Sequence, residues 1–299
     1  MGSVRKKTRE ILGCIGRMTE AKQKVYHLVL VYSYGAGFFS LFNKLFGYLQ
    51  KYSPIVAVTF QVYNPFKAYG EGEIFGKVFV PYINQTYLND DIEVIECFSY
   101  CDETLTGKQA SRLYTTKGCI DNNISLNWRQ EMNVLWRTYY QVHNQSIIQK
   151  LQAFVEQLNT YRAQGKRIIT FLLRHPALHV EQENNILPSF EMYDKAIQTQ
   201  AGGDLSKTVL VCLTDSQEAY EYFSEKYKNA HILFPEVQRR RADETDSTYN
   251  PGGDEKIEMA MLSVLYLSAG DHFIHPVSNM ATAVLIINPA ITNTYLVGI

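Results

Sequence analysis

The stretch Ile168–Glu183, which reads IITFLLRHPALHVEQE, decides how we interpret the fold of this chain. Residues 168–173 are apolar or β-branched, which is typical of a buried β-strand. The apolar run ends abruptly at Arg174, and His175 and Pro176 follow it. In an open α/β sheet, ligands bind where parallel strands end on their carboxyl side. We therefore predict a core strand that leads directly into a functional loop.

The second half of the chain alternates between strand patterns and helix patterns. Such alternation indicates parallel βα units and therefore a Rossmann-like sheet. Besides the strand at 168–173, the sequence predicts strands at 208–213, 230–234 and 272–275, and helices at 189–200, 217–228, 254–268 and 278–286.

The first half opens in a similar way, with an apolar strand at 25–32, a glycine turn that reads SYGAGFFS, and a helix at 40–52. Glycines let a backbone approach a ligand closely, and the exposed N–H groups at a helix start can hold an anion. The alternative is a tight connection that binds nothing. The residues that would line a ligand here are Gly35, Ala36, Gly37 and Phe38, with Asn43 on the first helical turn.

The rest of the first half has a weaker pattern. We expect strands at 55–62 and 92–98, a short strand or helix at 75–81, and helices at 126–142 and 145–164. Gly165 follows the last of these helices as a typical stop signal, so we place a domain boundary beside it. A chain of 299 residues is long enough for two domains, which we assign to residues 1–164 and 165–299.

The composition excludes several classes of protein. A net charge of −1 gives no field that would attract nucleic acid. The apolar run at 25–32 is much shorter than the ~20 residues of a membrane-spanning helix. The five cysteines are scattered, which favours reduced thiols and a cytoplasmic setting over a disulfide framework.

Polar side chains follow three of the predicted strands of the second half. Arg174 offers a planar donor fork that suits a phosphate, although a surface ion pair is the alternative. Asp215 and Ser216 follow the strand at 208–213, where Asp215 offers an acceptor for a ligand or a cap for its own helix. Ser278 and Asn279 begin a helix and would add hydroxyl, amide and N–H donors for the same anion.

Two carboxylates after Arg174 are candidates for a general base. Glu181 or Glu183 could take a proton from a hydroxyl nucleophile if a cleft shields it. His175 and His179 are rivals for this task, and their spacing also admits a metal. Pro176 disfavours a helix that would present both histidines on one face, so we expect no metal site.

A run of three arginines, Arg239–Arg241, lies in the predicted loop at 236–253. The simplest interpretation is a solvated loop, and the alternative is a clamp on a diphosphate.

Taken together, these segments resemble the fucosyltransferase superfamily that includes the α1,6-, α1,2- and protein O-fucosyltransferases. The resemblance is carried by YGAGFFSLFN near the N-terminus and by three segments of the second half, which read FLLRHPALHVEQ, LTDSQEAYEYFSEKY and LSVLYLSAGDHFIHPVSNMATAVL. The second half matches over nearly its whole length, whereas the first half matches at the glycine turn and in general layout.

The resemblance implies an α/β protein with two Rossmann-like domains that face each other across a cleft, an arrangement called GT-B. It also implies an inverting transfer of a sugar, from GDP-fucose as substrate and without a metal or other cofactor, to a hydroxyl of a glycan or protein. By this resemblance Arg174 would hold the donor diphosphate, with His175, Asp215, Ser216, Ser278 and Asn279 around the donor. A glutamate after the arginine would be the base, and we prefer Glu181 to Glu183.

The chain also departs from the pattern of this superfamily. His175 and Pro176 replace an arginine and a polar residue, and Ser263 stands where an aspartate often helps to bind the donor. These departures leave open a nucleotide-sugar-binding or interaction protein without catalysis. A phosphate-handling Rossmann enzyme unrelated to sugars is a third reading. The resemblance, without a membrane anchor, fits a bacterial protein, including one that acts inside a host cell.

Overall fold

The computed structural model describes residues 25–31, 38–39, 58–63, 74–80, 92–98, 125–174, 187–237, 239–241, 253–276 and 278–297. The helix predicted at 40–52 lies outside these residues.

A five-stranded parallel sheet forms the centre of the second half, as the alternating pattern predicted. Its order is β6-β5-β4-β7-β8, which places β4 in the middle. Every residue of β5, and every residue of β4 after Arg167, is buried. The strands are β4 (Arg167–Leu173), β5 (Thr208–Thr214), β6 (His231–Leu233), β7 (His272–His275) and β8 (Thr292–Tyr295).

The edge strand β8 is one that the sequence did not predict. It reads TNTY, which contains no apolar run, and none of its residues is fully buried. Its hydroxyls instead bond to His272 of β7, whose Nδ1 lies 2.7 Å from Thr292 Oγ1 and whose Nε2 lies 2.9 Å from Thr294 Oγ1. The strand is thus held by polar contacts that hydrophobic periodicity does not detect.

Helices cover both faces of this sheet, because successive strand residues point to opposite sides. On one face, Ile169 and Phe171 of β4 pack in a cluster with Tyr193 of α6 (Phe190–Ala201) and Phe223 of α7 (Gln217–Lys226). On the other face, α5 (Gln145–Ala163) and α8 (Gly253–Ser268) lie against β4. A short 3-10 helix, Leu205–Lys207, precedes β5.

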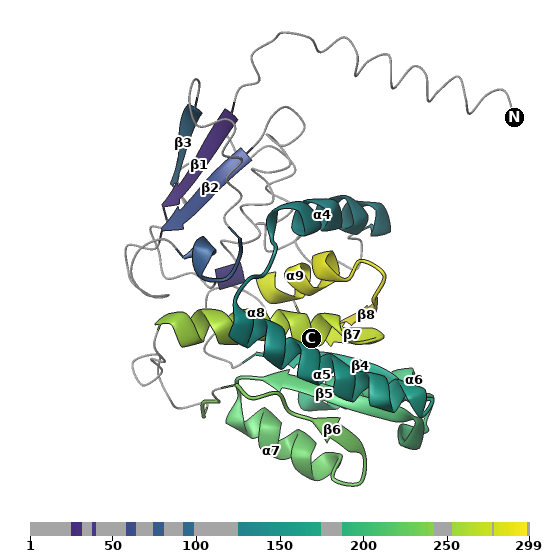
Figure 1. The fold of residues 1–299 in the computed structure, drawn as a ribbon. Helices are drawn as coiled ribbons and strands as arrows, with labels where there is room; N and C mark the ends of the chain where they lie inside the picture. The colour runs from purple at the N-terminus through teal and green to yellow at the C-terminus, as the bar shows by residue number, and fades with distance from the viewer. Residues whose placement is uncertain are drawn as a thin grey trace, which may run out of the picture.

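Two further helices pack beside α8. The helix α4 (Leu126–Tyr139) contacts α9 (Asn279–Ile287), and α9 contacts α8 (Figure 1). Buried Asn133 of α4 donates to the carbonyls of Ile286 and Ile287 at 2.8 and 3.0 Å. The helices α4 and α5 thus both precede residue 164 and contact elements of the second half, and the domain boundary at that position stays a prediction.

A second, three-stranded parallel sheet lies apart from the first (Figure 1). Its order is β2-β1-β3, and it confirms the three strands predicted in the first half. The segment near residue 75 forms a 3-10 helix, Phe75–Lys77. That the two sheets face each other across a cleft stays a prediction. The strands are β1 (Val25–Val31), β2 (Val58–Tyr63) and β3 (Ile92–Phe98).

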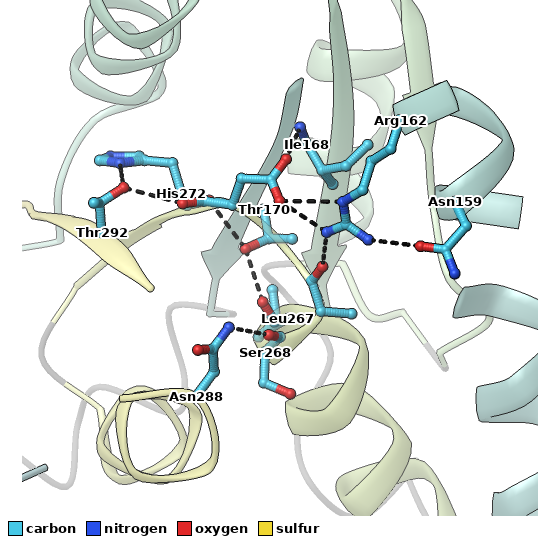
Figure 2. A network of polar contacts seen from close by, with 11 residues as sticks. Asn159, Arg162, Ile168, Thr170, Leu267, Ser268, His272, Asn288 and Thr292 are labelled. Atoms are coloured by element: carbon cyan, nitrogen blue, oxygen red, sulfur yellow. Dashed lines mark hydrogen bonds and ion pairs between the residues drawn. The ribbon is translucent and has the colours of Figure 1, made fainter. Parts of the chain in front are cut away.

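A polar network fixes the amino ends of β4 and β7, opposite the edge where ligands bind in such sheets (Figure 2). Asp271 accepts from the backbone N–H of Ile168 at 2.8 Å and from two nitrogens of Arg162 at 2.8 and 3.2 Å. Thr170 donates to the carbonyl of Leu267 at 3.0 Å, which ties β4 to the end of α8. The network holds the central strands in register.

In the described part of the chain, the helices are all too short or too polar to cross a membrane.

Candidate functional site

The carboxyl ends of β5, β4 and β7 meet at one edge of the sheet, because these three strands are parallel neighbours. In the observed register Leu173 pairs with Thr214. Continuing this register by one residue places Arg174 beside Asp215. The turn between β7 and α9 begins on the other side of β4.

Arg174 and Asp215 form a partly buried ion pair at this edge. Arg174 Nε lies 3.9 Å from Asp215 Oδ2, and 26% and 18% of the two side chains are exposed. This distance is longer than a hydrogen bond. Within the described residues, Arg174 donates no hydrogen bond. Its guanidinium is thus held near a carboxylate while its donor fork keeps its capacity for a ligand.

Ser216, and not Asp215, caps the helix α7. Its Oγ accepts the backbone N–H of Ala219 at 3.2 Å and donates to Glu218 Oε2 at 3.0 Å. This cap begins the helix immediately after the strand end. Asp215 is therefore placed beside Arg174 rather than used as the cap.

In the arginine run at 239–241, Arg239 and Arg240 are not solvated, which corrects the simplest reading of the sequence for these two residues, whereas Arg241 is exposed. Arg240 is 4% exposed, and its backbone bonds to Asp215 and Gln217, which makes an isolated parallel bridge just after β5. The guanidinium of Arg239 lies 4.3 Å from the ring centre of Tyr220. Arg241 pairs with Glu221 at 2.9 Å. Aromatic and backbone partners order this segment, and the run of charges in the sequence does not reveal them.

Ser278 caps α9 at the end of β7, as predicted. Its Oγ accepts the backbone N–H of Met280 at 3.1 Å, and only 9% of the residue is exposed. Asn279 is the first residue of the helix. The N-terminus of α9 thus lies at the same edge of the sheet as Arg174, although on the neighbouring strand.

Two buried histidines of β7, His275 beside this turn and His272 at the opposite end of the strand, were not singled out from the sequence. Burial lowers the pKa of His275 to about 4, and the nearby positive charge of Arg129 adds to this shift. Burial likewise lowers the pKa of His272 to about 4, with a further contribution from Arg167. Both imidazoles are therefore neutral at pH 7. Their position in a short apolar strand gave no sequence signal that they take part in a polar network.

Of the glycine-turn residues predicted to line a ligand, the structure describes Phe38 alone. Its ring is buried in the same hydrophobic cluster as Leu172, Leu213 and Met280, each within two residues of a predicted site residue. Gly35, Ala36, Gly37 and Asn43 lie outside the described residues, as do His175, Glu181 and Glu183.

Ser263, which stands at the position of a donor-binding aspartate in the resemblance, is buried in α8. Its hydroxyl donates to the carbonyl of Met259 one turn earlier at 2.7 Å. The Ser263 hydroxyl is therefore bonded to the backbone of its own helix.

Several solved structures are similar to this chain at low sequence identity. NodZ alpha-1,6-fucosyltransferase soaked with GDP-fucose is 15% identical and has a TM-score of 0.45, over 90% of this chain and 94% of that one. NodZ from Bradyrhizobium is 14% identical and has a TM-score of 0.47, over 89% of this chain and 94% of that one. A mutant of Arabidopsis thaliana FUT1 in complex with GDP is 8% identical and has a TM-score of 0.49, over 98% of this chain and 75% of that one.

The two NodZ structures are structures of fucosyltransferases. No protein-family model and no curated protein matches the sequence. At these TM-scores the likeness of fold is loose, so we rest the functional proposal on the site and on the sequence motifs.

Proposed function

We propose that this protein is a glycosyltransferase that moves a sugar from a nucleotide-sugar donor to a hydroxyl group. By the resemblance to fucosyltransferases, the donor that we propose is GDP-fucose, and the transfer would be inverting and would need no metal. The acceptor would be a hydroxyl of a glycan or a protein.

The observation that supports this proposal best is the position of Arg174. It follows the central strand, 26% of its side chain is exposed, and its 3.9 Å contact with Asp215 is too long for a hydrogen bond. A guanidinium that donates no hydrogen bond to the described residues suits a diphosphate at this edge, since its planar fork matches two phosphate oxygens.

The reaction needs negative charge to be stabilised on the departing nucleoside diphosphate. Arg174 would supply a fixed cation, and the N–H groups at the start of α9 would add oriented dipoles. Such preorganised groups stabilise charge where it develops in the transition state. Asp215 and Ser216 would hold the donor from the end of β5.

The remaining assignments concern residues outside the described part. Glu181 is the residue that we propose as the base for the acceptor hydroxyl, with Glu183 as the alternative. Gly35, Ala36, Gly37 and Asn43, with Phe38, would approach the donor from the glycine turn. His175 would lie beside Arg174.

The substitution Arg174→Ala tests the proposal. We expect it to weaken GDP binding at least about tenfold, because a charge-assisted pair of hydrogen bonds contributes more than about 1.4 kcal/mol. Isothermal titration with GDP measures the affinity, and release of GDP from GDP-fucose in the presence of acceptors measures transfer. Arg174→Lys keeps the charge but loses the fork, so it should fall between the alanine variant and the parent.

Arg167→Ala is the matched control, because Arg167 is exposed at the opposite end of the same strand. It should bind GDP like the parent. If Arg174→Ala bound GDP with the affinity of the parent and released GDP from GDP-fucose at the rate of the parent, Arg174 would have no part in the mechanism.

A second candidate function is a nucleotide-sugar-binding protein without catalysis. The buried Ser263 favours it, because its hydroxyl is bonded inside α8 and is not a carboxylate. This candidate predicts tight GDP-fucose binding with no GDP release across a panel of hydroxyl acceptors.

A further inference from the structure

A chain of hydrogen bonds connects α4 to the turn between β7 and α9. Arg129 of α4 donates from one terminal nitrogen to Asn293 Oδ1 at 2.8 Å and from the other to the carbonyl of Ile291 at 3.3 Å. Asn293 Nδ2 lies 3.1 Å from His275 Nε2. His275 Nδ1 lies 3.1 Å from the carbonyl oxygen of Pro276.

The direction of every bond in this chain is fixed by the chemistry of its ends. Arginine can only donate, so the amide oxygen of Asn293 faces it and the amide nitrogen faces His275. The carbonyl of Pro276 can only accept, so Nδ1 of His275 carries the proton. Nε2 of the neutral ring is then the acceptor that the Asn293 amide requires. The chain therefore has one consistent polarity, from the guanidinium to the turn.

The position of this chain of hydrogen bonds gives it a more specific role than general stabilisation. Arg129 is 7% exposed and His275 is fully buried. Within the described residues, Arg129 pairs with no carboxylate, so a buried positive charge polarises the bonds that follow it. The last acceptor, Pro276, lies two residues before the Ser278 cap of α9.

We propose that Arg129, Asn293 and His275 are positioning residues that hold the β7–α9 turn in the conformation in which the α9 N-terminus receives the donor diphosphate. This inference deepens the proposed function, because its nucleotide part rests on that function. None of these side chains touches the reacting atoms. They act through the carbonyl of Pro276, which sets where the turn leaves the strand.

Two near-isosteric substitutions on β8 separate this role from ordinary stabilisation. Asn293→Leu removes the bonds to His275 and to Arg129, whereas Thr294→Val removes a bond to His272, which does not reach the turn. Both variants lose hydrogen bonds to a buried β7 histidine. Asn293→Asp is a milder variant that keeps the pairing with Arg129 but places a second acceptor opposite His275 Nε2.

Hydrogen exchange of the segment 276–282 and titration with GDP provide two independent measurements. We expect both Asn293 variants to exchange faster in this segment and to bind GDP about threefold to tenfold more weakly, the equivalent of about one hydrogen bond. Thr294→Val should match the parent in both measurements, even if its melting temperature falls as much as that of the Asn293 variants.

Equal exchange in the Asn293 and Thr294 variants would overturn the positioning role. Faster exchange with unchanged GDP affinity would show that the turn is held by the chain but that its position does not serve the nucleotide, which also overturns the proposal. A parent protein that binds no GDP would overturn the proposed function itself, and the exchange measurement would then decide separately whether the chain holds the turn.

Discussion

Gly270 has no side chain, and this lets Thr170 of the central strand β4 lie close to the turn between α8 and β7. A Cβ atom at this position would lie 2.6 Å from Thr170 Cγ2 and 2.8 Å from Thr170 Oγ1. Thr170 cannot move away easily, because its hydroxyl donates to the carbonyl of Leu267 at 3.0 Å. The close approach therefore explains why glycine occupies the turn between α8 and β7.

The substitution Gly270→Ala should lower the free energy of unfolding by about 1–3 kcal/mol, which is the usual cost of overpacking. Urea unfolding measures the change. The same substitution in a Thr170→Ala background should cost less, since the two closest atoms are removed. Equal costs in the two backgrounds would show that Thr170 is not the source of the clash.

Among the elements, α4 depends on polar side chains for its place beside α9. Arg129 and Asn133 are one turn apart and therefore lie on the same face of the helix. Asn133 donates to two carbonyls at the C-terminal end of α9, where a helix lacks internal donors. The contact satisfies buried acceptors that would otherwise lose water without a replacement.

The substitution Asn133→Ala should destabilise the protein by about 1–3 kcal/mol, because it leaves buried carbonyls without a donor. Asn127→Ala is the matched control, since Asn127 is an exposed asparagine on the same helix. Chemical unfolding of both variants tests this prediction. Similar unfolding midpoints for the two variants would mean that the Asn133 contact contributes nothing to stability.

At the scale of the whole molecule, the two buried histidines of β7 make stability depend on pH. Burial lowers the pKa of His272 and of His275 to about 4, from an ordinary value of 6.5. Between these values the unfolded chain binds protons that the folded protein does not. Stability is therefore complete above about pH 6.5 and falls as the pH falls toward 4.

Each histidine should contribute a loss of up to about 1.4 kcal/mol per pH unit in this range. Urea unfolding at several pH values between 7.5 and 4.5 measures the slope. His272→Gln should reduce the slope, because one of the two groups no longer titrates. A free energy of unfolding that stays constant over this range would contradict the prediction.

The sequence was sufficient for the elements whose signal is local. The strands β4, β5 and β7 have helix patterns between them, so their positions in the sequence and their parallel direction followed from periodicity. Their polar neighbours Arg174, Asp215 and Ser278 were likewise predicted to lie at one edge. The pairing order β5-β4-β7 puts all three there.

Periodicity was insufficient where contacts between distant segments supply the energy. The strand β8 has no apolar run and its hydroxyls bond to His272, while the backbone of buried Arg240 bonds to Asp215 and Gln217. The partners of β8 and of Arg240 are both distant from them in the sequence.

By itself, the sequence determined the α/β class, the parallel strands and the edge where polar side chains gather, because buried strands and helix caps depend on local residue order. Only the tertiary structure decided that Arg129, Asn293 and His275 form one chain of hydrogen bonds. The direction of that chain follows from which donors and acceptors the fold brings face to face, and sequence spacing does not encode it.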